Sequence, residues 1–292
     1  MPEAARAAAL PPTIPYARSV IALERACFET IQRTVAALFR VAHADAFQRR
    51  ADAEPGADAV ARHRPANHAV FMGYDFHLTA QGPRLIEINT NAGGALLNGL
   101  HTAALCPPAQ LACLCAELLP VDAMRGRLLA TFAAEREAAR PGAPLTRVAI
   151  ADDRPEAQFL RAEFELFRAL FAGAGIEAAV CDVGDLERAT GGGLRIAGDP
   201  QRLDLVYLRD TDWRLAEPRS AALRAAYLAD EIVVTPSPRE HHLLAHKGRL
   251  AWFSSPETLH ALGASAEDAA LLAAVVPETH PLAALGVEIA WR

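Results

Sequence analysis

Hydrophobic and polar positions repeat with two different periods along this chain, and the N-terminal half predicts helices around a short hairpin. A helical pattern begins near residue 17 and is broken by a Pro/Gly-bearing stretch at 53–56. Residues 68–78 alternate between apolar and polar side chains and carry aromatic residues, which predicts a strand. A turn is predicted at 79–83 and a returning strand at 84–89. The two strands should pair as an antiparallel hairpin.

The second half of the chain has the rhythm of a parallel sheet, with short apolar runs between amphipathic stretches. A Pro/Gly-rich stretch at 140–144 separates it from the first half. The expected strands lie at 146–151, 176–181, 203–208 and 231–235, and the expected helices at 155–172 and 218–229. The first of these helices has an expected apolar stripe of Phe159, Phe164, Phe167, Leu170 and Phe171. These elements predict an α/β fold: helices with a β-hairpin, followed by a small parallel-sheet domain.

A further helix start follows the last predicted strand. Ser237 can cap a helix, Pro238 suits its first turn, and Glu240 completes a capping box. We expect this helix to run to about Phe253. The same strand order places Arg209 and the Ser237 loop at the carboxyl ends of parallel strands, the edge where open α/β sheets bind ligands.

Composition narrows the function classes. The chain has 292 residues, of which 52% are hydrophobic and 22% charged, as expected for a globular protein with a full core. Its formal net charge of -6 disfavours a broad nucleic-acid-binding surface, which needs a clustered positive face. No apolar run is long enough to span a membrane, and the Ala-rich start lacks the apolar core of a secretory signal. We therefore expect neither nucleic-acid nor membrane partners.

The cysteines are few and odd in number, which indicates reduced thiols in a cytoplasm. They are Cys27, Cys106, Cys113, Cys115 and Cys181. Cys106, Cys113 and Cys115 suggest a possible zinc site, but they lack C-x-x-C spacing, and the pattern at 108–119 predicts a buried helix. We favour a structural role for them.

Lysine is almost absent. Lysine and arginine total 29, and Lys247 is the only lysine. Such arginine bias can come from a GC-rich genome, so chance survival of one lysine stays open. The alternative is a position that needs a compact ammonium rather than a planar guanidinium.

The strand Leu85-Ile86-Glu87-Ile88-Asn89 offers the clearest candidate chemistry. Side chains alternate along a strand, so Ile86 and Ile88 should face the core while Glu87 and Asn89 face outward together. A carboxylate and an amide carbonyl are hard oxygen ligands of the kind that Mg²⁺ prefers. Taken alone, the pattern also fits an ordinary half-exposed strand with a polar outer face.

A family resemblance adds to this pattern. Residues 73–78, a glycine turn and the string IEINT at 86–90 resemble the metal-binding hairpin of eukaryotic-type glutathione synthetases. That family belongs to the ATP-grasp superfamily in circularly permuted form. The resemblance implies that Glu87 and Asn89 bind Mg²⁺ at the phosphates of ATP.

The likeness continues in the same order along the chain. Residues 204–210 resemble the family's strand that ends in a substrate-binding arginine, which implies that Arg209 grips a substrate carboxylate. Residues 232–237, followed by a helix with Lys247, resemble the segment that supplies an ATP-contacting lysine. The likeness covers about 73–252 and is weaker between 99 and 144.

The sequence departs from the family pattern in three places. The family has an arginine just before the aspartate of the first strand, where this chain reads Phe-Met-Gly-Tyr-Asp at 71–75. Polar serines that follow IEINT are replaced by Asn-Ala-Gly-Gly at 91–94. Both differences alter the implied amino-acid pocket. No segment matches the family's glycine-rich lid, second phosphate lysine or further metal-binding carboxylate.

The resemblance implies three consecutive parts. They are a helical region with the metal-ligand hairpin at 1–143, as part of an ATP-grasp-like lobe; a parallel α/β substrate domain of the pre-ATP-grasp kind at 144–260; and a C-terminal segment at 261–292, as the start of an otherwise missing ATP-grasp lobe. The implied function is ATP-dependent carboxylate–amine ligation with Mg²⁺ and ATP, acting on an amino acid or peptide-like substrate and expected to be incomplete in this chain. The alternative is a non-catalytic relative that binds a small ligand. A homodimer stays open.

Weaker candidates lie outside this pattern. His242 and His246 share a helix face with His241 beside them, but no third ligand completes a metal motif, so surface or capping roles are favoured. Asp152 and Asp153 follow a strand and precede a helix, where they could contact a substrate or simply cap.

Overall fold

The protein divides into two compact units that the chain enters and leaves repeatedly. The computed structural model describes residues 14–17, 21–105 and 120–281. Unit 1 comprises Met1–Ala22, His63–Phe71 and Asn91–Pro238, and unit 2 comprises Leu23–Arg62, Met72–Thr90 and Arg239–Arg292. This grouping differs from the three consecutive parts expected at 1–143, 144–260 and 261–292. The physical reason is that the hairpin packs with helices from both ends of the chain and not with its neighbours in sequence.

Unit 1 is built on a four-stranded parallel sheet. Its strands are β3 (Arg147–Asp152), β4 (Glu177–Asp182), β7 (Leu205–Leu208) and β8 (Val233–Thr235), in the order β4-β3-β7-β8. All three strand pairs are parallel. The predicted α/β class and the predicted strands of the second half are confirmed.

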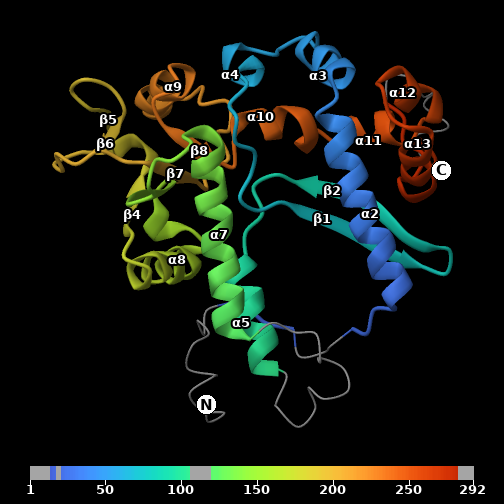
Figure 1. Ribbon diagram of the computed structural model, residues 1–292, viewed down its shortest axis with the longest axis horizontal. Helices are drawn as coiled ribbons and strands as arrows, with labels where there is room; N and C mark the ends of the chain where they lie inside the picture. The colour runs from blue at the N-terminus through green and yellow to red at the C-terminus, as the bar shows by residue number, and fades with distance from the viewer. Residues whose placement is uncertain (1–13, 18–20, 106–119, 282–292) are drawn as a thin grey trace. The chain divides into compact units, whose positions relative to one another are not determined.

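One face of this sheet carries the core of unit 1. Helices α7 (Val121–Ala139) and α8 (Arg161–Gly173) cover that face, as Figure 1 shows. Alternate strand residues point toward these helices, because successive side chains of a strand face opposite ways. The core that they form includes Val148, Ile150, Leu205, Tyr207, Val233, Phe132, Phe164, Phe167 and Phe171. Unit 1 also contains α5 (Ala95–Leu105), η1 (Pro155–Ala157), η2 (Val183–Asp185), β5 (Leu186–Arg188), β6 (Leu194–Ile196), η3 (Pro218–Ser220) and α9 (Ala221–Leu228).

The helix expected at 155–172 is interrupted near its start. A short 3₁₀ turn, η1, ends at Ala157. Gln158, which follows it, has an extended backbone, and α8 begins only at Arg161. Phe159 lies in this break and is 67% exposed, so the prediction that it belongs to the apolar stripe was wrong. The later phenylalanines of the stripe are buried as predicted.

Unit 2 is a hairpin packed against helices. Strands β1 (Gly73–Thr79) and β2 (Gly82–Asn89) pair antiparallel, which confirms the predicted hairpin. Helices α2 (Arg25–Ala42) and α13 (Ala266–Val275) share a core with β2 (Figure 1). The other helices are α3 (Asp45–Asp52), α4 (Ala59–Arg62), α10 (Pro238–Glu240), η4 (His241–Ala245), α11 (Arg249–Phe253) and α12 (Pro256–Ala261).

The single helix expected from Ser237 to Phe253 is broken into three pieces. After α10 the chain forms the π-helical segment η4, then a turn at 246–248, and then α11. Lys247 therefore lies in a turn rather than within a helix. A π-helical segment closes wider hydrogen-bonded rings than an α-helix and is found often at functional sites.

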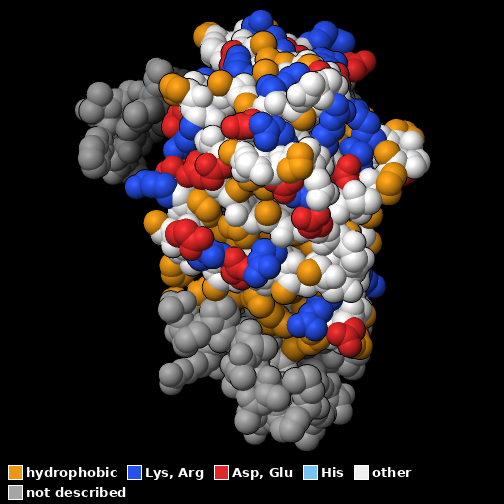
Figure 2. All heavy atoms as spheres, turned by 90° about the vertical axis from the view of Figure 1, so that its left-hand side faces the viewer, with side chains coloured by type: hydrophobic (Ala, Val, Ile, Leu, Met, Phe, Trp, Pro, Cys, Tyr) orange, Lys and Arg blue, Asp and Glu red, His pale blue; other side chains and the backbone are white. Residues whose placement is uncertain are grey.

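Two further observations concern the helices and the surface. No helix among the described residues is long and apolar enough to cross a membrane. On the face drawn in Figure 2, Lys and Arg side chains are interspersed with Asp and Glu side chains.

Candidate metal and phosphate site

The hairpin of unit 2 contains a β-bulge beside its predicted metal ligands. Phe76 of β1 pairs with Leu85, whereas Asp75, the residue before Phe76, pairs with Glu87. Ile86 is therefore an extra residue without a partner across the ladder. A bulge of this kind bends the strand and re-aims the side chains that follow it.

The bulge decides which side chains face the core. Leu85 and Ile88 are both buried although they are three positions apart, whereas Ile86 is only half-buried. The expectation that Ile86 and Ile88 would share the core face was wrong, because the inserted residue resets the alternation. Glu87 and Asn89, on either side of buried Ile88, lie together on the outer face.

A third polar side chain joins them from the opposite strand. Asp75 is the cross-strand partner of Glu87, and Asn89 Nδ2 donates a hydrogen bond of 3.3 Å to Asp75 Oδ2. We call Asp75, Glu87 and Asn89 the hairpin face. Sequence reasoning left Asp75 out; the signal that could have found it is the cross-strand register, since directly opposed residues of a hairpin share a face.

Lys247 reaches the hairpin face. Its Nζ lies 3.5 Å from Glu87 Oε1, and the side chains of Lys247 and Glu87 are 70% and 35% exposed. The resemblance implied that this lysine and this glutamate serve one site, and unit 2 does bring them together. Lys247 is the only lysine in the chain, so it is the only ammonium side chain that could serve there.

The turn that carries Lys247 is held by a buried arginine. Arg249 donates from Nε to Leu243 O at 3.1 Å and from Nη2 to His242 O at 3.1 Å. It also forms a bidentate ion pair with Glu54, with Nη2 to Oε2 at 2.7 Å. Arg249 thus supplies donors to backbone carbonyls of η4 and fixes the start of α11. Lys247, two residues before Arg249, therefore projects from a restrained backbone.

The histidines of this region have structural partners. His242 is buried, which corrects its expected surface role, and its Nε2 lies 3.7 Å from Asp52 Oδ1. Burial lowers the pKa of His242, and the nearby cations Arg249 and Arg239 lower it further. His246 Nδ1 accepts a hydrogen bond of 3.1 Å from the backbone N–H of Gly248, as expected for a capping role.

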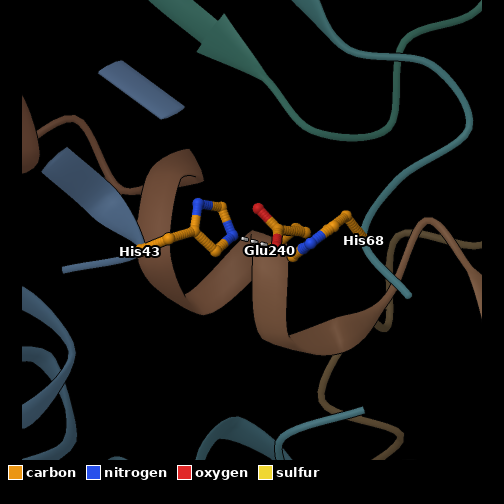
Figure 3. Close-up of side chains that lie close together, drawn as sticks. All are labelled: His43, His68 and Glu240. Carbon is orange, nitrogen blue, oxygen red and sulfur yellow. Dashed lines mark hydrogen bonds and ion pairs between the residues drawn. The ribbon is translucent and has the colours of Figure 1, made fainter. Parts of the chain in front are cut away.

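Two further hydrogen bonds tie this region to its surroundings within unit 2. His241 Nδ1 and Thr90 Oγ1 lie 2.7 Å apart, which links η4 to the end of β2. His43 Nε2 and Glu240 Oε1 are joined by a hydrogen bond of 2.8 Å, drawn in Figure 3. Glu240 was expected to complete a capping box, and its buried carboxylate instead contacts this histidine.

The chemistry of the hairpin face fits a hard divalent cation. It offers carboxylate oxygens from Asp75 and Glu87 and an amide carbonyl oxygen from Asn89, and Mg²⁺ prefers oxygen ligands. The amide nitrogen of Asn89 donates to Asp75, so Oδ1 is the amide atom that would serve as a metal ligand. Mg²⁺ commonly takes one or two protein carboxylates and completes its shell with waters and phosphate oxygens.

Arg209, the predicted substrate arginine, lies at the carboxyl end of β7 in unit 1 and is 8% exposed. Its Nη1 donates to Asn91 Oδ1 and, at 3.1 Å, to Ala92 O. Asn91 returns a hydrogen bond from Nδ2 to Arg209 O at 3.0 Å. Part of the guanidinium is therefore committed to holding the loop after β2. The buried Nε of Arg209 makes no hydrogen bond among the described residues.

A buried glutamate holds the same loop from the other side. Glu163 of α8 is 1% exposed and accepts backbone N–H groups from Gly94 at 2.7 Å and Leu96 at 3.0 Å. A carboxylate at these N–H groups caps α5 and interacts favourably with its dipole. Gly93 packs so closely that a Cβ would lie 2.9 Å from Arg209 Nη2 and would overlap Leu160. Only glycine fits this close approach.

Further charged groups gather at this edge of the parallel sheet. Asp152 is the last residue of β3 and is 7% exposed. Arg219 forms two ion pairs nearby: its Nη1 lies 2.6 Å from Asp153 Oδ1, and its Nη2 lies 3.1 Å from Asp210 Oδ2. Burial raises the pKa of Asp152 to about 6, and the nearby charge of Asp210 also raises it, against a hydrogen bond from Asp153 N–H and the charge of Arg209. We call Asp152, Arg209, Asp210 and Arg219 the sheet-edge cluster.

The cysteines contribute no metal site among the described residues. Cys106, Cys113 and Cys115 lie outside those residues. Cys27 and Cys181 are free thiols, and burial raises the pKa of Cys181 to about 12, which keeps it protonated and unreactive.

Comparisons with known proteins bear on the fold. No protein-family model matches the sequence, and no curated protein matches it. A solved structure does share the fold: a glutathione synthetase-like effector from Globodera pallida in its apo form, with a TM-score of 0.58 at 14% sequence identity. The match covers 87% of this chain and 61% of that one. This chain thus spans less than two thirds of its neighbour's length, and at this identity the likeness shows the fold alone.

Proposed function

We propose that this chain binds ATP with Mg²⁺ at the hairpin face and serves a glutathione synthetase-like, ATP-grasp type ligation of a carboxylate to an amine. One observation carries the proposal. Glu87 and Lys247, distant in sequence, meet with 3.5 Å between Nζ and Oε1. The shared fold with a glutathione synthetase-like protein supports it.

Each residue has a separate task in this proposal. Glu87 and Asn89 hold the metal, and Asp75 fixes the amide of Asn89. Lys247 offers a compact positive charge on a flexible stem to a phosphate of ATP. The metal, when bound, neutralises charge on the phosphates.

The substrate would be an amino acid or a peptide-like acid. In this class of reaction the substrate carboxylate takes the terminal phosphoryl group of ATP and releases ADP. An amine then attacks the acyl carbon, loses a proton and expels phosphate, so that an amide bond forms. Arg209 is the candidate to orient the carboxylate, because a guanidinium can hold a carboxylate through two parallel hydrogen bonds.

A second candidate function is binding without turnover. Arg209 Nη1 is already committed to Asn91 and Ala92, which leaves less of the guanidinium for a substrate. The chain also has no second lysine to clamp phosphate beside Lys247. Both observations favour a relative that binds a small anionic or peptide-like ligand.

Calorimetry with Mg²⁺ and a non-hydrolysable ATP analogue tests the shared part of both candidates. We expect the wild-type chain to bind the complex and Glu87→Gln to weaken binding by about tenfold or more. Glu267→Gln, which removes an exposed carboxylate of unit 2 paired with Arg33, is the matched control and should bind like wild type. Equal binding by wild type and Glu87→Gln would contradict the site.

Turnover then separates the two candidates. The ligase predicts ADP formation that requires both an acid and an amine. The binding protein predicts nucleotide binding without it.

A further inference from the structure

The hairpin face holds its own counter-ion. Asp75 and Glu87 carry two negative charges, and the ammonium of Lys247 lies 3.5 Å from Glu87 Oε1. The ammonium therefore sits against an oxygen that the proposed function gives to a metal. The ammonium of Lys247 and the proposed metal ion would both contact the same oxygen, Glu87 Oε1.

We propose that Lys247 acts as an internal counter-ion that competes with the metal for Glu87 until a nucleotide arrives. The inference rests on the proposed function and concerns its regulation. Metal alone would bind weakly, nucleotide phosphate would draw Lys247 away, and the two ligands would strengthen each other's binding.

Electrostatics gives the reason. A divalent cation binds a carboxylate oxygen at about 2.0–2.6 Å. An ammonium 3.5 Å from the same oxygen would then lie within a few ångströms of the metal, and two positive charges at that separation repel. The lysine must leave, or an anion must come between the two cations. The phosphates of a nucleotide supply that anion.

The local structure permits such an exchange. Arg249 restrains the backbone beside Lys247 through its bonds to His242 O, Leu243 O and Glu54. The Lys247 side chain is 70% exposed and has four rotatable bonds, so its ammonium can move while the turn stays in place. Because the ion pair with Glu87 is exposed, it is weak enough to be replaced.

Binding of Mn²⁺ alone, followed by electron paramagnetic resonance of the free ion, tests the competition. We expect Lys247→Met to bind Mn²⁺ about two- to fivefold more tightly than wild type, the size set by one exposed ion pair. Arg33→Met is the matched control, since it also removes one positive charge from an exposed ion pair of unit 2. Its affinity for Mn²⁺ should equal that of wild type.

A second measurement follows the lysine itself. Because Lys247 is the only lysine, chains grown with labelled lysine give one side-chain signal. Mg²⁺ alone should shift this signal in wild type but not in Glu87→Gln. A non-hydrolysable ATP analogue should raise the Mn²⁺ affinity of wild type more than that of Lys247→Met, because reciprocal coupling is lost with the lysine.

The outcomes distinguish this inference from the proposed function. If Glu87→Gln abolishes Mn²⁺ binding while Lys247→Met binds no more tightly than wild type, the counter-ion role is wrong and the metal site stands. If neither wild type nor Lys247→Met binds Mn²⁺, both the site and the inference are wrong. Tighter binding by Lys247→Met, with Arg33→Met unchanged, supports the inference.

Discussion

The buried carboxylate of Asp152 makes the stability of the protein depend on pH. It lies at the end of β3, almost fully buried, and burial raises its pKa to about 6, with Asp210 raising it further. The ordinary pKa of an unfolded Asp is about 3.9. Between these values the folded state binds more protons than the unfolded state, so stability falls as pH rises through this range.

Replacing this carboxylate with an amide should therefore stabilise the protein at high pH. We expect Asp152→Asn to raise the free energy of unfolding by about 1–3 kcal/mol at pH 8. The difference should vanish near pH 4, where Asp152 is protonated in the folded state. Denaturant unfolding at both pH values measures it. Asp153→Asn, which removes the neighbouring partner of Arg219, should bring no such gain, and a less stable Asp152→Asn at pH 8 would contradict the argument.

At the scale of elements, buried Arg249 joins η4 to the start of α11 and pairs with the half-exposed carboxylate of Glu54. Arg249 is 2% exposed and places its guanidinium 4.2 Å from the ring centroid of Trp252. Burial alone would raise the pKa of its partner Glu54, but the hydrogen bond and charge of Arg249 outweigh burial and lower it. The pair therefore favours the ionised carboxylate.

Removing Arg249 should loosen this whole element. We expect Arg249→Met to lower the free energy of unfolding by about 2–3 kcal/mol, because the buried carbonyls of His242 and Leu243 lose their donor. Arg50→Met is the control: Arg50 stacks 4.4 Å from the same Trp252 ring but is exposed, and we expect a change within about 0.5 kcal/mol. Denaturant titration compares them. Equal effects would show that the buried bonds of Arg249 contribute little.

The elements that the sequence predicted are those fixed by local pattern. The hairpin, the parallel strands and the buried phenylalanines of α8 follow from periodicity and turn residues. The bulge at Ile86 and the break after Ala245 do not, because each involves a partner distant in sequence: β1 across the ladder for the bulge, and Glu54 for the Arg249 that follows the break.

The same distinction, between features set by local sequence and features set by distant partners, applies to the candidate site. Glu87 and Asn89 were predicted from alternation, and the resemblance implied Lys247, which the fold of unit 2 brings to Glu87. Asp75 was missed because its place depends on cross-strand register. The commitment of Arg209 to Asn91 and Ala92 could not be predicted either, since it depends on how Glu163 and Gly93 shape the loop.

At the scale of the whole molecule, the chain passes between its two units five times, at 22/23, 62/63, 71/72, 90/91 and 238/239. The hairpin face and Lys247 belong wholly to unit 2, and the sheet-edge cluster belongs wholly to unit 1. Each unit has its own hydrophobic core. A ligand that binds one site should therefore stabilise one unit first.

Hydrogen exchange measured by mass spectrometry can locate that effect. With Mg²⁺ and a non-hydrolysable ATP analogue at about one hundred times Kd, binding stabilises the site by about 2.7 kcal/mol, or roughly a hundredfold in exchange through opening of unit 2. We expect slower exchange in β2 and in the turn at 246–248. Amides of β3 and β7 that exchange through local opening should change little. Glu87→Gln should abolish the slowing, whereas slowing confined to unit 1 would place the nucleotide elsewhere than at the hairpin face.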